Sequence, residues 1–208
     1  MEEYIIESVR ESSAALQQLL EPKSVAFMDE AAKLLAHCFR VGNKVIIAGN
    51  GGSLCDAAHF AEELTGQFRQ KRKALPAIAL TDSSHITCVG NDFGFDQIFA
   101  RGVEAFGKEG DIFVGLSTSG NSKNIIYAFE TAKALGLSTI AFLGKSGGML
   151  KGFADLEISI DGFSTSDRIQ EAHMAAIHII IEMVEKYLFD NAVELMETLL
   201  LKEECTTP

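Results

Sequence analysis

The stretch KVIIAGNGGS, residues 44–53, passes from a short apolar segment directly into a glycine-rich loop. Its apolar part is short and rich in β-branched residues, which is typical of a buried strand. A helix is predicted to follow from about Ser53 to Leu64, because Gly66 then supplies an end signal. A strand, a loop and a helix in this order indicate an α/β fold.

The same order recurs along the chain. Further strands are predicted at 77–80, 111–116, 138–143 and 156–160, with helices from the loop at 117–122 to about 135 and over about 167–188. Short apolar strands that alternate with helices predict a parallel sheet that is covered on both faces.

Helical segments flank this alternating region. Residues 3–20 and 24–40 have the apolar spacing of amphipathic helices, and residues 191–202 predict one more. We expect a single domain over 1–208, with an N-terminal helical segment (about 1–41) and a C-terminal helical extension (about 191–208). Helices at both ends of such a sheet are expected to make subunit contacts.

Composition narrows the classes of function. The net charge is −11, and the one basic cluster, residues 67–73, is interpreted as a solvated loop, so no nucleic acid is expected as a partner. No apolar run reaches the roughly 18 residues of a membrane span, and the acidic N-terminus lacks a signal-peptide pattern. The four cysteines form no CxxC pair, which favours a reducing compartment. We therefore expect a cytoplasmic protein with no membrane partner.

The loop at 49–53 is a candidate anion site. It opens a helix, where unpaired amides and the positive end of the helix dipole favour negative charge. Its glycines allow close approach of the backbone, and Ser53 adds a hydroxyl. The alternative is a tight turn that only needs flexible glycines. Neither a Walker loop nor the GxGxxG pattern is present, so no nucleotide cofactor is expected.

A second loop, STSGNS at 117–122, gives the stronger signal. It brings the hydroxyls of Ser117, Thr118, Ser119 and Ser122 to the carboxyl end of a predicted strand. Ligands of open α/β sheets bind at that edge, and hydroxyls with amides can hold a phosphate without a lysine. The alternative is a helix cap with incidental serines. Two such loops after two strands of one sheet favour a phosphate site.

Two predicted helices carry candidate catalytic side chains. His59 and Glu63 are four residues apart and share one helix face, whereas Glu62 points away. The alternative for the pair is an ordinary surface interaction. On the helix over 167–188, His178 stands in an apolar run and is expected to be buried with a polar partner. The alternative is a hydrogen-bonded core histidine.

Two more side chains of that helix are of interest. Gln170 lies two turns before His178 on the same broad face. His173 is offset from both and is interpreted as a supporting or interface residue.

A carboxylate and a histidine near a phosphate suit aldose–ketose isomerisation. The carboxylate can move a proton between C1 and C2 through an enediol, while an acid–base partner opens the ring or moves the oxygen proton. His59, Glu63, Gln170 and His178 also form a mixed nitrogen and oxygen set that suits zinc. If Glu63 binds zinc, its role as a free base must be reconsidered, because a ligated carboxylate is a weaker base.

Five motifs together resemble the phosphoheptose isomerases of the sugar isomerase (SIS) domain group. They are GNGGS at 49–53, HFAEELTG at 59–66, VGNDFGF at 89–95, STSGNS at 117–122 and RIQE at 168–171, in unbroken order within about 40–190. The resemblance implies a three-layer αβα sandwich with a five-stranded parallel sheet, a homotetramer, and sites built between subunits. It also implies conversion of sedoheptulose 7-phosphate to D-glycero-D-manno-heptose 7-phosphate, for the ADP- or GDP-heptose of lipopolysaccharide core or other surface glycans.

By position, the resemblance implies a role for each site residue. Glu63 would be the general base and His178 its acid–base partner. The phosphate would be held by Ser53, Ser117, Thr118, Ser119 and Ser122. The sugar chain would contact Asn50, Asp92, Asp167 and Gln170, with Gly51, Gly52 and Asn91 completing the substrate-binding set. Some family members hold zinc at the positions of His59, Glu63, Gln170 and His178. Gln67 stands where some relatives have arginine, so a cationic contact there is lost or passes to Arg69.

Two non-enzymatic functions compete with this interpretation. A SIS relative that binds the bacterial replication initiator resembles this chain in both loops, but it lacks the glutamate and histidine that correspond to Glu63 and His178. Sugar-phosphate-sensing SIS modules usually accompany a DNA-binding or transferase domain, for which 208 residues leave no room. The presence of both residues favours the enzyme. The anomer of the product and the choice between ADP- and GDP-heptose stay open.

Overall fold

The computed structural model describes residues 1–190, so the helix predicted over 191–202 lies outside the described residues. Within them, five parallel strands form a sheet in the order β2-β1-β3-β4-β5. The strands are β1 (Val45–Gly49), β2 (Ala77–Ala79), β3 (Ile112–Ser117), β4 (Ser138–Gly144) and β5 (Leu156–Ile160). The predicted five-stranded parallel sheet is confirmed, and every strand boundary agrees with the sequence-based one to within one residue.

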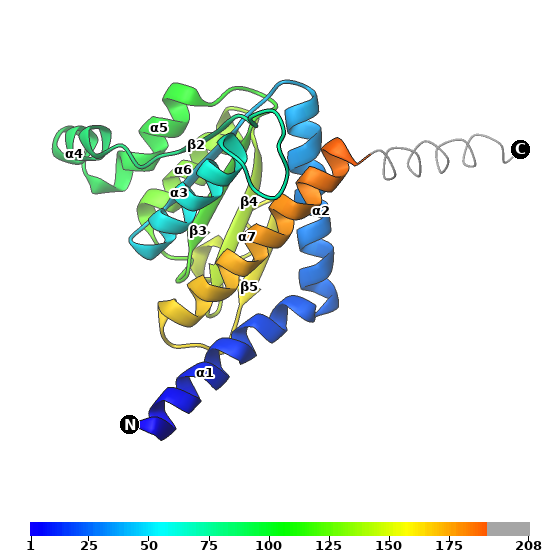
Figure 1. Cartoon of the computed structure of the whole chain (residues 1–208). Coiled ribbons are helices and arrows are strands. Elements are labelled where there is room, and N and C mark those ends of the chain that lie inside the picture. The colour runs from blue at the N-terminus through cyan, green and yellow to red at the C-terminus, as the bar shows by residue number, and fades with distance from the viewer. Residues whose placement is uncertain (191–208) are drawn as a thin grey trace, which may run out of the picture.

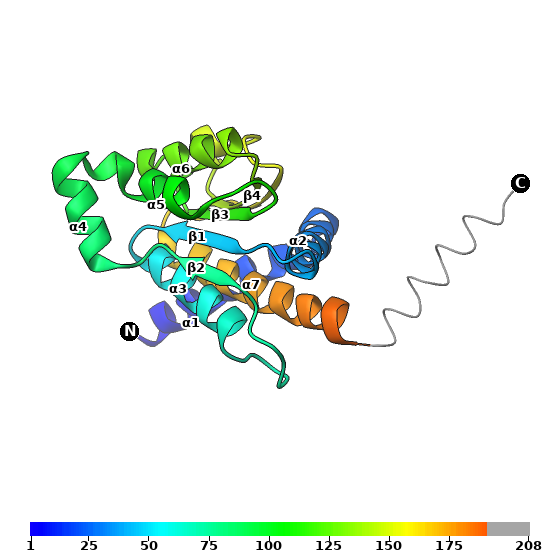
Figure 2. The same ribbon diagram turned by 90° about the horizontal axis from the view of Figure 1, so that it is seen from above.

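Helices cover both faces of the sheet (Figure 1; Figure 2). One face carries α2 (Pro22–Arg40), α3 (Gly52–Thr65) and α7 (Ser166–Phe189), and α1 (Glu2–Gln17) packs along α7. The other face carries α5 (Ile98–Phe106) and α6 (Lys123–Ala134), with α4 (Ser83–Asp92) beside them. Short 3-10 turns lie at Gln18–Leu20, Phe95–Gln97 and Gly148–Leu150. The expected αβα sandwich is therefore the observed fold.

The central strands β1, β3 and β4 are buried on both sides, because their side chains alternate between two cores. Ile47 and Val114 enter the core under α2, α3 and α7, whereas Ile46 and Phe113 enter the core under α5 and α6. This burial leaves the strand ends, and the loops that follow them, as the accessible polar part of the sheet.

The segment between β2 and β3 holds two helices that the sequence did not predict. The side chain of Asp82 accepts a hydrogen bond from the backbone N–H of His85 and so starts α4. Both α4 and α5 are short, at 10 and 9 residues. α5 has a clear apolar face, but both helices fall short of the roughly 11 to 18 residues over which a helical period is recognised in sequence.

α1 projects from the body of the molecule (Figure 1). Its one buried residue is Ala15, while Tyr4, Ile5 and Val9 are 76%, 63% and 60% exposed. Arg168 of α7 holds α1 in place. Its Nη2 donates to Ser8 Oγ at 2.9 Å, and its Nε pairs with Glu11 at 3.4 Å. The predicted apolar stripe exists, and most of it faces outward.

α7 is 24 residues long and crosses one face of the sheet. Its buried side, which includes Ile177, Ile180 and Ile181, packs into the core, and polar residues occupy other positions. None of the helices within residues 1–190 combines the length and the apolar character needed to cross a membrane.

Candidate functional site

The two glycine-containing loops leave the same edge of the sheet side by side. β1 and β3 are neighbouring parallel strands, and Gly49 pairs in register with Leu116. The side-chain amides of Asn50 and Asn124 exchange two hydrogen bonds, of 2.8 and 2.9 Å. These bonds tie the first loop to the start of α6, so the two loops form one surface.

A hollow of about 380 Å³ lies between these loops, and its lining residues are Asn50, Gly51, Phe95, Asp96, Ser122, Lys123 and Asn124. Ser122 makes no side-chain cap to α6, and the Ile125 N–H already donates to the Ser122 carbonyl at 3.0 Å, so the amides of Lys123 and Asn124 are the ones available to an anion. Lys123 adds a positive charge 3.9 Å from an Asp96 carboxylate oxygen. The hollow thus offers amides, the Ser122 hydroxyl and one cation to a phosphate, with the Asp96 carboxylate beside that cation.

Internal hydrogen bonds shape the second loop. The Ser117 hydroxyl accepts from the Gly120 N–H at 3.1 Å and lies 3.4 Å from the Ser122 hydroxyl. Ser119 accepts from the Asn121 N–H at 3.2 Å. Gly120 has φ +64°, and a Cβ there would lie 1.8 Å from the Gly147 carbonyl oxygen, so only glycine fits.

The first loop contacts α7 through Gln170. Its amide nitrogen lies 3.4 Å from the Ser53 hydroxyl. A Cβ on Gly52 would lie 2.6 Å from the same amide, so a larger residue there would displace the Gln170 side chain. Two predicted substrate-binding residues therefore adjoin each other although 117 positions separate them.

A cluster of three titratable side chains joins α3 to α7. Glu63 Oε1 lies 3.1 Å from His59 Nε2 and 3.6 Å from His178 Nε2. The two imidazole rings meet edge to face at 5.2 Å between centroids. One candidate ligand atom from each residue lies within 4.8 Å of the others. The sequence-based pairing of His59 with Glu63 on one helix face is observed, and His178 completes the group from another helix.

Burial differs across this cluster. The Glu63 side chain is 12% exposed, and its Oε2 is buried without a hydrogen-bond partner. His59 and His178 are 42% and 39% exposed. The expectation that His178 is buried is wrong, because its face of α7 looks toward α3 and the loop after it rather than into the sheet. An orphaned carboxylate oxygen beside two accessible imidazoles suits a metal ion.

Residues after α3 pack against the exposed side of His178. Phe68 stacks on its ring at 5.8 Å between centroids, with 21° between the planes. Arg69 pairs with Glu182 of α7 at 2.8 Å. Some relatives have an arginine at the position of Gln67. Because Arg69 already pairs with α7, it is a poor candidate to supply that cationic contact instead.

Asp56 lies on the same face of α3, one turn before His59. One of its carboxylate oxygens is buried without a partner. Burial raises the pKa of this carboxyl to about 6, and the nearby His59 opposes that shift. No sequence motif had singled out this residue.

Three other residues of the predicted substrate-binding set lie on the surface. Asn91 and Asp92 end α4, are both exposed, and hydrogen-bond to each other at 2.6 Å. Asp167 is exposed in the first turn of α7, where a hydrogen bond from Thr165 lowers its pKa. Phe95 and Asp96, rather than Asn91 and Asp92, line the hollow from this side.

His173 belongs to the core. It is fully buried, and its Nε2 lies 2.8 Å from the Leu143 carbonyl oxygen. Burial lowers the pKa of this imidazole to about 4, so the residue is neutral at physiological pH. Its interpretation as an interface residue is wrong.

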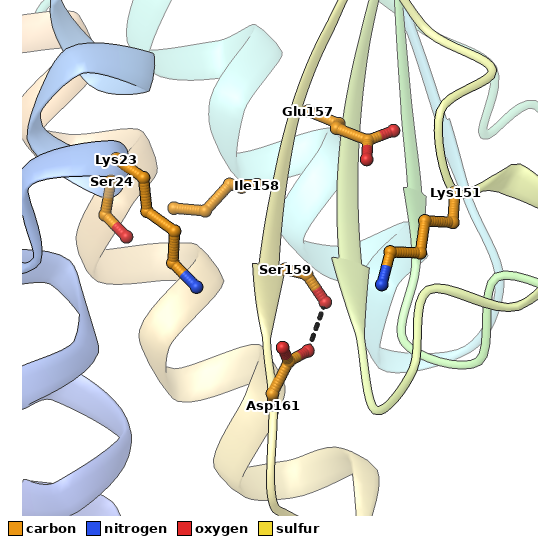
Figure 3. Close-up of a pocket in the computed structure, with 7 residues that line it drawn as sticks. All are labelled: Lys23, Ser24, Lys151, Glu157, Ile158, Ser159 and Asp161. Atoms are coloured by element: carbon orange, nitrogen blue, oxygen red, sulfur yellow. Dashed lines mark hydrogen bonds between the residues drawn. The ribbon is translucent and has the colours of Figure 1, made fainter.

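A separate cavity of about 210 Å³ lies beside β5 (Figure 3). Lys23 and Ser24 enter it from α2, Glu157, Ile158 and Ser159 from β5, and Lys151 and Asp161 from flanking loops. The Ser159 hydroxyl donates to Asp161 at 2.5 Å. The charges of two lysines and two carboxylates in this cavity sum to zero. None of the predicted site residues lines the cavity.

Comparison with known proteins agrees with this geometry. The family model of the SIS domain matches residues 9–144. A phosphoheptose isomerase of Fusobacterium nucleatum is 60% identical over 167 residues, which are 80% of this chain and 86% of that protein. The chain belongs to the phosphoheptose isomerase family. The family resemblance read from the five motifs is therefore confirmed.

Two further comparisons extend the family match to the whole site. A phosphoheptose isomerase of Vibrio cholerae is 52% identical over 186 residues, covering 89% of this chain and 97% of that protein. The structure of a phosphoheptose isomerase from Francisella tularensis superposes with a TM-score of 0.83 at 37% identity, over 88% of this chain and 97% of that one. At such coverage the family match extends beyond the SIS model, which ends before α7, into the helix that carries His178.

Proposed function

We propose that this chain isomerises sedoheptulose 7-phosphate to D-glycero-D-manno-heptose 7-phosphate. The observation that carries the proposal is the pair Glu63 and His178, whose nearest atoms lie 3.6 Å apart on two different helices. Relatives that are 60% and 52% identical are phosphoheptose isomerases. A SIS protein that only binds a partner has no need of such a pair.

Proton transfer explains the roles of the two residues. Glu63 takes the proton from C1 of the ketose and returns it to C2, so the intermediate is an enediol. His178 moves the accompanying proton between O2 and O1, which leaves the aldehyde at C1. The low exposure of Glu63 limits the water that could compete for the carbanion-like intermediate.

Substrate binding is assigned to the two loops. Ser53, Ser117, Thr118, Ser119 and Ser122, with the amides of α6, would hold the phosphate, and Asn50, Gln170, Asp92 and Asp167 would contact the sugar chain. The Asn50–Asn124 amide bonds support this division, because they hold both loops in one arrangement.

Zinc fits the cluster. His59, Glu63 and His178 supply two imidazole nitrogens and a carboxylate, and the unpaired Glu63 Oε2 lacks any other partner among the described residues. Gln170 is proposed as the fourth ligand. A bound zinc ion would polarise a substrate oxygen as a Lewis acid, and it would make Glu63 a weaker base, because a ligated carboxylate loses part of its basicity. Full activity without zinc would leave the same residues as a pure acid–base set. Elemental analysis of protein purified without chelator should find zinc, and His59→Ala combined with His178→Ala should remove it.

We further propose a homotetramer of single-domain subunits in the cytoplasm. The exposed apolar residues of α1, together with Leu20 (70% exposed) and Val25 (49% exposed), form a surface that a partner copy could cover. Light scattering should give a mass of about four chains, and a fully active monomer would contradict this.

One assay tests the central proposal. Purified protein is incubated with sedoheptulose 7-phosphate, and aldoheptose phosphate is sought. The expected result is product formation that depends on Glu63. Failure with every ketose phosphate offered would leave the binding functions as the better interpretation.

A further inference from the structure

Arg72 occupies an unusual place in a stretch predicted to be a solvated basic loop. Its side chain is 2% exposed, whereas Arg69 of the same stretch is 60% exposed. The prediction of a wholly solvated cluster is therefore wrong at this one residue. A buried guanidinium is costly unless each of its N–H groups finds an acceptor.

The guanidinium finds its acceptors on both helices of the catalytic cluster. Nε donates to Glu185 Oε1 on α7 at 2.7 Å. Nη2 donates to the backbone carbonyl of Glu63 at 2.7 Å, and Nη1 donates to that of Leu64 at 2.8 Å. Nη1 also reaches the Lys73 carbonyl at 3.2 Å, which closes the loop on itself.

The two carbonyls explain why an arginine stands here. Glu63 and Leu64 are in the last turn of α3, where backbone carbonyls have no partner within the helix. A cation at that end is also favoured by the helix dipole. Arg72 thus completes α3 at the residue that carries the proposed base.

The bonds of Arg72 form a bridge between α3 and α7. Its α7 end, the Glu185 carboxylate, lies on the same helix as His178, the proposed acid–base partner. Glu185 follows His178 by seven residues on α7, so the two side chains share a helix face about two turns apart. Glu185 is itself 2% exposed. One planar group therefore connects the backbone of Glu63 to the helix of His178 through hydrogen bonds alone.

We propose that Arg72 is a positioning residue, which holds α3 and α7 at the separation that catalysis needs. The inference rests on the proposed isomerase function. Glu63 and His178 come from helices more than a hundred residues apart in sequence, so packing and this bridge set their 3.6 Å contact. Displacements of about 1 Å in a catalytic group can cost about 100-fold in rate.

The competing explanation is that Arg72 only stabilises the fold. Buried ion pairs are weak evidence for stability, because desolvation offsets their attraction. The test must therefore separate activity from folding. Arg72→Met removes all four bonds, Arg72→Lys keeps a charge opposite Glu185, and Glu185→Gln keeps the bonds to α3. Val103→Ala, in the core on the other face of the sheet, serves as the destabilised control.

Each variant is assayed for kcat and KM on sedoheptulose 7-phosphate, far below its measured Tm. We expect Arg72→Met to lower kcat about 10- to 100-fold with KM within about threefold of wild type. Arg72→Lys should recover part of the loss, because one ammonium cannot reach both carbonyls and the carboxylate. Glu185→Gln keeps an acceptor for Nε but loses the charge, so its kcat should fall less than that of Arg72→Met, whereas Val103→Ala should lower Tm while kcat stays within about threefold.

The outcomes are distinct. If Arg72→Met and Val103→Ala have equal kcat at similar Tm, Arg72 is only structural and the proposal fails. If Arg72→Met does not fold, Arg72→Lys decides: its kcat must fall more than that of Val103→Ala, and equal values overturn the proposal. Inactivity of the wild type with every ketose phosphate would instead remove the isomerase function, so the two failures are distinguishable.

Discussion

The proposed phosphate loop and the proposed catalytic cluster are built in opposite ways. The loop at 117–122 is contiguous, and its own hydrogen bonds, such as Gly120 N–H to Ser117, set its shape. The cluster is local only in part, since His59 and Glu63 share one face of α3. Glu63 and His178 meet only because α3 and α7 pack together on one face of the sheet. Binding is thus encoded locally, whereas chemistry depends on tertiary structure.

The largest expected effect breaks the chemistry and leaves binding intact. Glu63→Gln keeps the side-chain shape but removes the base, so kcat should fall about 10²- to 10⁴-fold with little change in KM. Steady-state kinetics with sedoheptulose 7-phosphate measures this. Glu62→Gln is the matched control, since Glu62 is 67% exposed and should lose little activity. Loss of activity in Glu62→Gln alone would reverse the assignment of the base.

A smaller effect breaks binding and leaves the chemistry intact. Ser119→Ala combined with Ser122→Ala should weaken sugar-phosphate binding about 10- to 100-fold, because each hydrogen bond to a charged group contributes about 1.5–3 kcal/mol and water replaces part of it. Titration calorimetry gives the affinity, and kcat at saturation should change little. Unchanged affinity would move the phosphate to the first loop.

The pH dependence of stability tests the core beneath the cluster. His173 has a pKa of about 4 when folded and about 6.5 when unfolded, so the unfolded chain binds the proton first as pH falls. The contribution of His173 to stability should therefore be constant above about pH 6.5 and decline toward pH 4, by up to about 3 kcal/mol.

His173→Gln keeps a donor for the Leu143 carbonyl but does not titrate. Urea unfolding from pH 7.5 to 4.5 should show a shallower decline for this variant than for wild type. His37→Gln, at an exposed position, should follow wild type. Identical slopes for all three proteins would contradict the burial argument.

The smallest expected effect concerns Arg69. Its exposed ion pair with Glu182 contributes about 0–1 kcal/mol, so Arg69→Ala should leave kcat and KM within about twofold. Kinetic assays alone suffice here. A tenfold rise in KM would mean that Arg69 contacts the substrate after all and compensates for Gln67.

The sequence predicts the features of the fold and site that are encoded locally, and it misses those that depend on tertiary packing. All five strands and both loops were predicted, because apolar runs and glycine–serine loops are local signals. The pairing of His59 with Glu63 was also predicted, because helical spacing is local. The exposure of His178 and the burial of Arg72 were not, since both depend on how the segment after α3 folds against α7. No periodicity within either segment carries that information.

The Asn50–Asn124 amide pair has a consequence for how binding responds to the medium. Each amide donates once and accepts once, and neither group gains or loses a proton in the physiological range. The link between the loops should therefore be insensitive to acidity and nearly insensitive to ionic strength. Any dependence of substrate affinity on these conditions then belongs to the phosphate itself and to the charged groups around it, while the two loops keep their relative arrangement.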